Sequence, residues 1–560
     1  MAQNQQQTLP NNQAQPNMPQ REVSTVAETF VAQLAAFGVQ RIYGVAGDTF
    51  LDFLDAIHKS DALEFIAVKH ESTAAFMASA EAKFTGGIGV CLATSGPGMA
   101  NLLNGLGDAY QDQVPVLAIT GQVPTNKIGT DSKQYLDQQV FIEPLAAYSG
   151  LLASPEATVE VICKAVHTAL EQGAVTHISV PKDLFAKAQT KQIRPVPDLV
   201  KGETRLGQAD VAEAVEILRS AKQPVVVAGI GARPAADEVV KLCQTWGAGL
   251  ILSLGAKGMI DETCELLMGG IGKGGSPYAS EMLKKADVVL LAGDTWWPEG
   301  YVPENVRIVQ VDYEANNIGS RFAVELGIVG DTRTILPFLA EGLQGVQPNA
   351  QWVQQVKQAK GQWYAQVEQE ATTEGTPIHP ARLIRAVQNT VREDAVICVD
   401  TGDHTVWFNR IFQGKRHDVL FSGTWRSMGF GLPAAMACQL ADGMRQVVAL
   451  VGDGCLGMNL ADLSTAARYN LPITVIVVNN GYLQMETDRQ KVGEHDVYGS
   501  DLTNPDFQMV AEACGLTAFR VDNSTELEQT LEGALSFPGP TLVEVMTDDV
   551  MFPNTTANEG

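Results

Sequence analysis

The stretch QVVALVGDGCLGMNLADLSTAARYNLPITVIVVNN, residues 446–480, decides the fold of this chain. The apolar run 446–451 is typical of a buried parallel strand, and it ends at a GDG turn whose glycines allow tight backbone geometry. A helix-like segment follows, and a second apolar run, 473–478, ends at Asn479 and Asn480. The pattern predicts a strand, a helix and a strand in one right-handed unit of a parallel α/β sheet.

Two polar residues, Asp453 in the GDG turn and Asn480, directly follow these predicted strands. Open α/β sheets bind ligands at the carboxyl ends of their strands, so we expect the two side chains to lie near one another. A carboxylate, an amide oxygen and a nearby backbone carbonyl suit a Mg²⁺ ion that keeps positions open for phosphate oxygens. A GDG turn alone is common without a metal; the polar turn after the next strand is what favours a metal–phosphate site.

Composition limits the function classes. The chain has 560 residues, 45% hydrophobic and 18% charged, which indicates a globular protein of about three domains. Its formal net charge of −25 argues against nucleic acid or an anionic membrane as a partner. No apolar run approaches the roughly 20 residues that span a bilayer. The eight cysteines show no metal-type spacing, so we expect reduced thiols in a cytoplasmic protein.

Periodicity divides the chain into three α/β domains, each expected to hold a mainly parallel sheet flanked by helices. The order glycine turn, helix, proline and apolar strand occurs at 452–478 and again at 95–120, which favours two similar domains. The predicted boundaries are 1–20 for a disordered tail, 21–190 for the first domain, 205–343 for the central domain, 344–377 for a partly helical linker, 378–548 for the third domain and 549–560 for a polar tail.

In the first domain, Glu71 follows a strand-like run and begins a helix, and the turn SGPG at 95–98 follows another such run. A glutamate at a helix start is ordinarily no more than favourable to the helix dipole. Here the surrounding sequence, 69–124, resembles the pyrimidine-binding domain of thiamine diphosphate (ThDP) enzymes, and 446–480 resembles their metal–diphosphate motif. The resemblance covers residues 22–548 and implies ThDP and Mg²⁺ as cofactors.

The resemblance implies catalytic roles for three residues. Glu71 would hydrogen-bond a ring nitrogen of the cofactor's aminopyrimidine and promote its imino tautomer, and Met428 would support the cofactor in its bent shape. Gln134 would lie beside the active centre, in the sequence Lys133-Gln134-Tyr135, where relatives usually carry Phe-Gln-Glu. A lysine in place of an apolar ring alters the wall that faces the substrate.

The resemblance also implies the groups that hold Mg²⁺ and the diphosphate. Asp453 and Asn480 would bind the metal through their side chains, and Tyr482 through its carbonyl oxygen. The residues implied at the diphosphate are Gly402, Asp403, His404, Gly452 and Gly454.

The central domain carries the turn GIGAR, residues 229–233, after a strand-like run. A lone GxG turn is weak evidence, but the order of later motifs resembles the FAD-binding domain of pyruvate oxidases and acetolactate synthases. Glycine amides and basic side chains suit a pyrophosphate, and an acid at a strand end suits the adenosine half. The implied flavin residues are Gly229, Gly231, Arg233, Lys257, Lys273 and Asp312.

These motifs favour the pyruvate oxidase branch of the ThDP family. GIGAR is the oxidase-like form of the flavin turn, and GDTWWPEG at 293–300 lacks the arginine-bearing motif of a synthase. The expected reaction is FAD-dependent oxidative decarboxylation of pyruvate or a close 2-keto acid, with the acyl group passing to phosphate or water. One alternative is an acetolactate synthase-type carboligase with structural FAD. Another is a non-catalytic nucleotide-binding protein, which the intact Glu71, Asp453 and Asn480 disfavour.

The resemblance implies a homo-oligomer as well. Because Glu71 and the GDG turn lie on separate domains, the family arrangement brings them together across a subunit interface. We therefore expect a dimer at least, and a tetramer in preference to a dimer.

Overall fold

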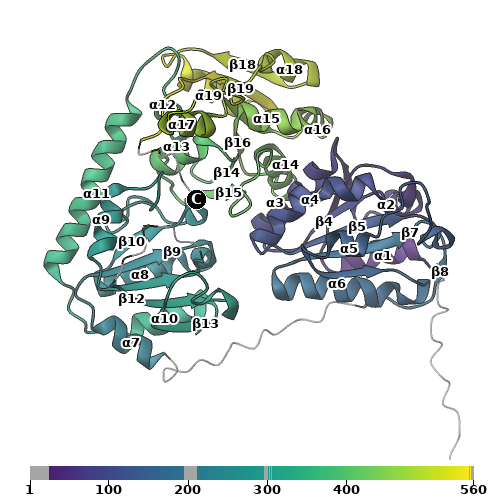
Figure 1. Cartoon of the computed structure of the whole chain (residues 1–560), viewed down its shortest axis with the longest axis horizontal. Coiled ribbons are helices and arrows are strands. Elements are labelled where there is room, and N and C mark those ends of the chain that lie inside the picture. The colour runs from purple at the N-terminus through teal and green to yellow at the C-terminus, as the bar shows by residue number, and fades with distance from the viewer. Residues whose placement is uncertain are drawn as a thin grey trace, which may run out of the picture.

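The computed structural model describes residues 24–194, 211–295, 300–301, 303, 305–553 and 555. The predicted tail at 1–20 lies outside the described residues. Figure 1 shows three α/β domains at the corners of a triangle, with the first domain on the right, the central domain at the lower left and the third domain at the top. This arrangement confirms the predicted fold class.

The first domain is built on a six-stranded parallel sheet in the order β3-β2-β4-β5-β7-β6. Strands β4 and β5 are buried along their whole length, as expected for apolar runs covered by helices on both faces. The strands are β2 (Arg41–Gly44), β3 (Glu64–Ala67), β4 (Gly89–Ala93), β5 (Val116–Gln122), β6 (Ala146–Leu151) and β7 (Val175–Pro181), with a short antiparallel pair, β1 (Ser24–Thr25) and β8 (Ala188–Gln189). The helices are α1 (Val26–Ala36), α2 (Leu51–His58), α3 (Glu71–Thr85), α4 (Pro97–Gln111), α5 (Gln138–Ile142) and α6 (Thr158–Gln172).

The third domain repeats this sheet strand for strand, in the order β15-β14-β16-β17-β19-β18. In both sheets the second strand of the chain lies at one edge and the fifth at the other, which confirms the prediction of two similar domains. Its strands are β14 (Val396–Val399), β15 (Asp418–Phe421), β16 (Val447–Gly452), β17 (Ile473–Asn479), β18 (Thr517–Val521) and β19 (Thr541–Met546). Its helices are α12 (Pro380–Thr390), α13 (Asp403–Ile411), α14 (Gly431–Ala441), α15 (Asp453–Asn459), α16 (Leu463–Arg468), α17 (Gln484–Val492), α18 (Phe507–Cys514) and α19 (Leu527–Leu535).

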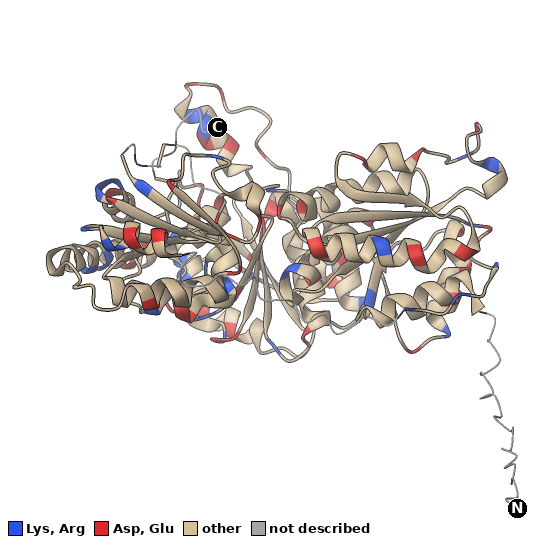
Figure 2. Ribbon diagram, turned by 90° about the horizontal axis from the view of Figure 1, so that it is seen from below, with Lys and Arg blue, Asp and Glu red and all other residues tan. Residues whose placement is uncertain are grey.

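The central domain has a five-stranded parallel sheet in the order β10-β9-β11-β12-β13. Its strands are β9 (Pro224–Ala228), β10 (Gly249–Leu252), β11 (Val288–Ala292), β12 (Arg307–Asp312) and β13 (Leu326–Val329), and its helices are α7 (Ala212–Arg219), α8 (Ala236–Trp246), α9 (Pro277–Lys285) and α10 (Thr332–Gly342). In the view of Figure 2, acidic and basic residues are interspersed along the helices. Among the described residues, no helix is both long and apolar enough to cross a membrane.

Helix α11 (Ala350–Ala371) occupies most of the predicted linker, 344–377. Near its start, Trp352 is buried in the central domain, where its Nε1 donates to the Pro224 carbonyl at 2.9 Å. Farther along, Trp363 and Val367 belong to a core of the third domain. The linker is therefore a helix that contributes to two cores, along the left edge of Figure 1.

Helices α3 and α14 pack together and join the first domain to the third. Phe76 of α3 meets Phe430, just before α14, edge to face, with ring centroids 6.0 Å apart. Asp462 of the third domain accepts from the backbone N–H of Lys69 at 2.8 Å and from the Thr73 hydroxyl at 2.7 Å. These contacts fix the start of α3, the helix that carries Glu71.

Candidate active site

The structure divides the predicted active-site residues into two half-sites, one on the first domain and one on the third. On the first domain, Glu71 begins α3 and is 9% exposed. Its Oε2 accepts a hydrogen bond from Asn101 Nδ2 at 2.9 Å, and its Oε1 would lie 3.2 Å from a Cβ at Gly98. Among the described residues, Glu71 has no hydrogen bond to the third-domain half-site.

Gln134 lies against the same SGPG turn as Glu71. Gly96 has φ +65°, and a Cβ there would lie 2.8 Å from the Gln134 carbonyl oxygen. Gln134 itself has φ +62°, and its side chain is exposed. The turn therefore needs glycine at 96, both for its conformation and for the close approach of the loop. Gln134 lies against Gly96 and Glu71 against Gly98 of the same turn.

On the third domain, the ends of β14 and β16 form a narrow cradle around His404. A Cβ at Gly402 would lie 2.8 Å from the imidazole Cε1, and one at Gly452 would lie 3.1 Å from it. Burial lowers the pKa of His404 to about 4. Its Nε2 and the neighbouring Asp403 Oδ1 are buried with no hydrogen-bond partner among the described residues. Orphaned polar atoms beside a glycine cradle fit a site that a polar ligand completes.

The three predicted metal ligands lie together at the ends of β16 and β17. Asp453 accepts from the backbone N–H groups of Gly454 and Gly481, both at 2.9 Å. Asn480 Oδ1 accepts from the Tyr482 N–H at 3.1 Å. Burial raises the pKa of Asp453, so a bound cation would offset the cost of its charge.

The donor set at this place consists of one carboxylate, one amide oxygen and one backbone carbonyl. No group of three His, Cys, Asp or Glu residues in the described ranges could hold a metal ion. A metal at Asp453 would therefore depend on neutral oxygen ligands. Such ligands suit Mg²⁺, which takes few protein ligands and keeps positions for phosphate. The residues present fit that ion.

Met428 is half-buried in a loop that is tied to this edge of the sheet. Asp400, at the end of β14, accepts from the N–H groups of Gly429 at 3.0 Å and Gly431 at 2.8 Å. Asn459 Nδ2 donates to the Gly429 carbonyl at 2.7 Å. Burial raises the pKa of Asp400 to about 6. The loop is thus fixed directly after Met428, next to Asp400, which precedes the turn that carries Gly402.

Sequence reasoning missed several residues that support the site. Asn101 holds the Glu71 carboxylate, Asp400 holds the Met428 loop, and Asn504 Nδ2 donates to Asp453 Oδ2 at 2.8 Å. Asn101 follows the SGPG turn by one helical turn, and that spacing was the available signal. Asn504 is far from Asp453 in the chain, and no local pattern predicts the contact.

Asp403→Asn tests the burial of Asp403 through the pH dependence of stability. The pKa of this carboxyl group is raised from 3.8 to about 7, first by burial and then by the charge of Asp488, with Lys273 opposing. The folded protein therefore keeps a proton that the unfolded chain has lost, and stability falls as the pH rises from 3.8 to about 7. We expect the variant's advantage to grow over that range, up to about 4 kcal/mol, and to level off above it. Melting temperatures of the cofactor-free protein measure this; an advantage that does not change with pH would contradict it.

The predicted flavin residues lie mostly at the carboxyl ends of the central sheet. A Cβ at Gly229 would lie 2.3 Å from the Gly293 carbonyl oxygen, so this glycine allows two turns to pack closely. Asp312 ends β12, and its Oδ1 accepts from the Glu314 N–H and from Asn317 Nδ2 at 3.0 and 2.9 Å. Gly231 follows Gly229 in the same turn, and its N–H donates to the Gly293 carbonyl.

The predicted basic flavin residues already have partners inside the protein. Arg233 forms an ion pair with Asp418 of the third domain at 3.0 Å. Lys257 forms a buried ion pair with Glu262 at 2.7 Å. Lys273 lies over the Phe552 ring, 5.9 Å from its centroid. The glycine turns lie at the strand ends, where α/β sheets bind dinucleotides, but Arg233 and Lys257 do not supply the free positive charge predicted for a pyrophosphate.

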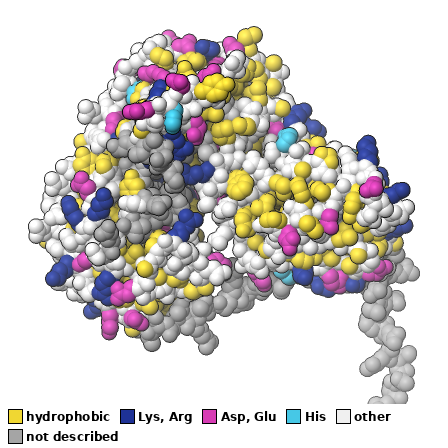
Figure 3. Space-filling model, in the orientation of Figure 1, with side chains coloured by type: hydrophobic (Ala, Val, Ile, Leu, Met, Phe, Trp, Pro, Cys, Tyr) yellow, Lys and Arg dark blue, Asp and Glu magenta, His cyan; other side chains and the backbone are white. Residues whose placement is uncertain are grey.

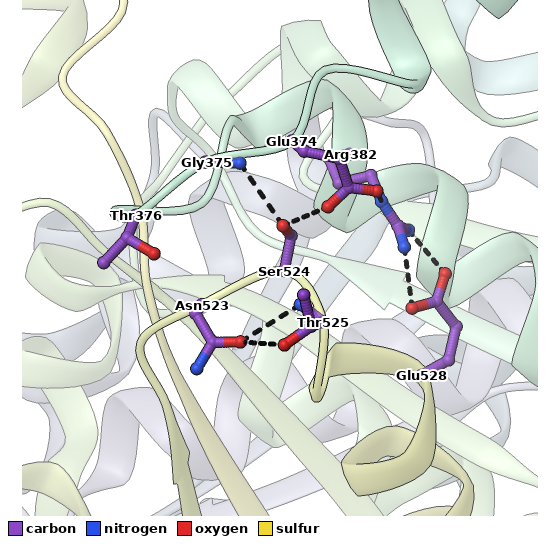
Figure 4. A pocket seen from close by; sticks show the side chains of 8 residues that line it. All are labelled: Glu374, Gly375, Thr376, Arg382, Asn523, Ser524, Thr525 and Glu528. Carbon is purple, nitrogen blue, oxygen red and sulfur yellow. Dashed lines mark hydrogen bonds and ion pairs between the residues drawn. The ribbon is translucent and has the colours of Figure 1, made fainter.

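The structure also contains a polar cavity of about 470 Å³ away from these residues. It lies between the α11–α12 connection and the loop before α19, and Figure 4 shows Arg382 paired with Glu374 and Glu528 there. Its acidic groups are matched by this arginine and by the Ser524 hydroxyl, which donates to Glu374. The cavity contains none of the predicted site residues.

Comparison with known proteins agrees with this division into half-sites. The descriptions "Thiamine pyrophosphate enzyme, N-terminal TPP binding domain", "central domain" and "C-terminal TPP binding domain" match residues 24–141, 211–339 and 400–545. Glu71 falls in the first range and Asp453 in the last.

Three relatives match nearly the whole chain. The putative thiamine pyrophosphate-containing protein YdaP of Bacillus subtilis is 32% identical, over 93% of this chain and 91% of that protein. A pyruvate oxidase of Lactiplantibacillus plantarum is 30% identical, over 93% and 88%. A probable acetolactate synthase large subunit of Methanococcus aeolicus is 28% identical, over 93% and 92%. With all three domains matched in order, the chain belongs to the family of thiamine diphosphate-dependent enzymes.

Proposed function

We propose that this enzyme uses ThDP and Mg²⁺ to decarboxylate pyruvate or a close 2-keto acid, with FAD as the oxidant and phosphate or water as the acyl acceptor. The observation that carries the oxidase assignment is the GIGAR turn, residues 229–233, at the end of β9, in a chain that aligns over 93% of its length with a pyruvate oxidase. The choice between oxidase and synthase rests on this turn, because the oxidase and synthase relatives have similar sequence identity to this chain, 30% and 28%.

Two groups of residues would act on the cofactor. Glu71, held by Asn101, would form a hydrogen bond to a ring nitrogen of the cofactor and pass a proton across it during the reaction. Asp453, Asn480 and the Tyr482 carbonyl would hold Mg²⁺ and through it the diphosphate. Bound ThDP supplies the carbon nucleophile that attacks the 2-keto group.

The wall beside the substrate would be formed in part by the loop at 133–135. Gln134 lies against Gly96 of the SGPG turn, and Glu71 lies against Gly98 of the same turn. Lys133 is exposed in the same loop. Its positive charge suits the carboxylate of a 2-keto acid or an anionic acyl acceptor such as phosphate.

The glycine turns at the strand ends of the central sheet, together with Asp312 at the end of β12, support FAD as a cofactor. Bound FAD supplies a two-electron oxidant. Arg233 and Lys257 are paired with acids, and the N–H groups of Gly229 and Gly231 donate to backbone carbonyls. The pyrophosphate would therefore need other backbone N–H groups at this edge of the sheet.

A homo-oligomer completes the proposal, because Glu71 and Asp453 lie on different domains and share no contact within the described chain. Figure 3 shows hydrophobic side chains gathered over the visible face of the first domain. Large apolar residues exposed on α4 and α5 are Tyr110, Val140 and Phe141. Exposed apolar surface of this kind is typical of an interface with a second subunit.

The alternative is a carboligase of acetolactate synthase type, in which FAD would be structural. The observation in its favour is the set of acetolactate synthase relatives, which are 28–30% identical over at least 90% of the chain. The two functions differ in product and in electron flow.

An assay of the purified protein with pyruvate should separate the two. We expect a yellow protein that, with ThDP, Mg²⁺ and FAD, consumes oxygen or reduces a soluble acceptor while forming acetate or acetyl phosphate. Adding anionic vesicles should not raise the rate, since the net charge of −25 disfavours binding to them. Acetolactate formed without acceptor reduction would instead assign the carboligase.

A further inference from the structure

Gln484 connects the proposed metal ligand Asn480 to two other parts of the third domain. It is the first residue of α17, and its side chain is buried. Its Oε1 accepts from Asn480 Nδ2 at 3.0 Å. Its Nε2 donates to Asp488 Oδ1 at 2.7 Å and to the Asp549 carbonyl at 3.2 Å. Every polar atom of this buried amide is therefore in use.

The contact with Asn480 decides which end of that amide can face a cation. Asn480 Nδ2 is turned toward Gln484, so Oδ1 points the other way, where it accepts from the Tyr482 N–H at 3.1 Å. An asparagine amide rotates easily without such a partner, and its two ends are similar in size. A rotated amide would present N–H donors to a positive ion instead of an oxygen ligand.

We propose that Gln484 is a positioning residue for the metal: it fixes the Asn480 amide with its oxygen toward Mg²⁺ and links that ligand to the C-terminal segment 547–553. The inference rests on the proposed role of Asn480 in binding Mg²⁺. Hydrogen-bond partners behind metal ligands commonly set both orientation and affinity.

The link to the C-terminal segment runs through Asp488 and Asp549. Asp488 Oδ2 accepts from the Phe552 N–H at 3.3 Å. The Phe552 ring is 1% exposed and meets Trp407 with centroids 4.7 Å apart. This segment therefore packs onto the third domain.

Because Gln484 contacts both Asn480 and the C-terminal segment, metal binding and the order of that segment affect each other. If the ordered segment holds Gln484 in place, and Gln484 holds Asn480, then metal binding at Asn480 favours the ordered segment by the same free energy. The Phe552 N–H reports this directly, because its hydrogen exchange requires the contact with Asp488 to open.

The test compares Gln484→Met, which keeps the length but loses all three hydrogen bonds, with Glu486→Gln, an exposed site on the same helix. We expect Gln484→Met to weaken Mg²⁺ binding about tenfold in calorimetric titrations with ThDP present. Hydrogen exchange over 547–553 should slow on adding Mg²⁺ and ThDP in the wild type and in Glu486→Gln, but not in Gln484→Met. A cooperative melting transition and an unchanged circular dichroism spectrum confirm that the variant folds.

A second variant, Gln484→Glu, separates the two parts of the inference. It keeps an acceptor for Asn480 Nδ2 but places a carboxylate beside Asp488 and the Asp549 carbonyl. We expect faster exchange over 547–553, no slowing of that exchange on adding Mg²⁺ and ThDP, and a smaller loss of Mg²⁺ affinity than in Gln484→Met. Wild-type affinity and exchange in Gln484→Met would overturn the inference. If the wild type itself bound ThDP without needing Mg²⁺, the proposed metal site would fail instead, and the two failures are distinguishable.

Discussion

Asp453→Ala is expected to abolish Mg²⁺-dependent ThDP binding while leaving the fold intact. Asp453 is the single carboxylate in a donor set otherwise made of neutral oxygens, so its removal leaves the cation and the diphosphate without their charge balance. The fold should persist, because the N–H groups of Gly454 and Gly481, which donate to Asp453, belong to half-buried residues. Water can accept their hydrogen bonds once the carboxylate is removed. Calorimetric titration of ThDP at fixed Mg²⁺ measures the loss.

Asp522→Ala provides the matched control for this substitution. Asp522 is an exposed acid of the same domain, paired with Arg520 at 3.2 Å. The Asp522→Ala protein should bind ThDP with wild-type affinity. Wild-type affinity in Asp453→Ala would remove the metal assignment.

Glu71→Gln is expected to fold and to bind ThDP but to lose activity by about 10² to 10⁴-fold, the range of general acid–base catalysis. Glutamine keeps the size of the side chain and can still hydrogen-bond to Asn101, but it has no acidic proton to share with the cofactor. The measurement is kcat with the natural cofactors at saturating substrate, because an interaction made only during reaction lowers kcat without raising KM.

Glu143→Gln, at an exposed glutamate of the same domain, is the control and should keep full activity. A Glu71→Gln enzyme that retained most of the wild-type rate would show that another group handles the proton.

The frame of the fold was predictable because its signals are local. The apolar runs that became β16 and β17, the glycine turn between strand and helix, and the proline before the next strand all lie within one short stretch. The same order at the SGPG turn predicted a second domain of this kind, and the two sheets do share one strand order.

The supporting contacts of the site were not predictable, because each joins residues far apart in the chain. Nothing near Arg233 indicates that Asp418 neutralises it across a domain boundary, and nothing near Lys257 indicates a buried pair rather than a free cation. The burial of Phe552, in a tail predicted to be polar, could not be predicted for the same reason. Its partner Trp407 lies far away in the chain, on α13. The motifs indicate which strand ends carry the candidate ligand-binding residues, and tertiary packing decides which of their charges remain available.

The proposed ThDP site combines Glu71 of one subunit with Asp453 of another. Coexpression of Glu71→Gln and Asp453→Ala chains, with different purification tags, tests it most directly. A mixed dimer then holds one site with both changes and one site with neither, because a two-fold interface exchanges equivalent surfaces.

The measurement is the activity of doubly tagged dimers made from these two inactive chains. We expect them to recover about half of the wild-type activity, because one site of the two is intact. Mixed dimers as inactive as either parent would contradict a site shared between subunits.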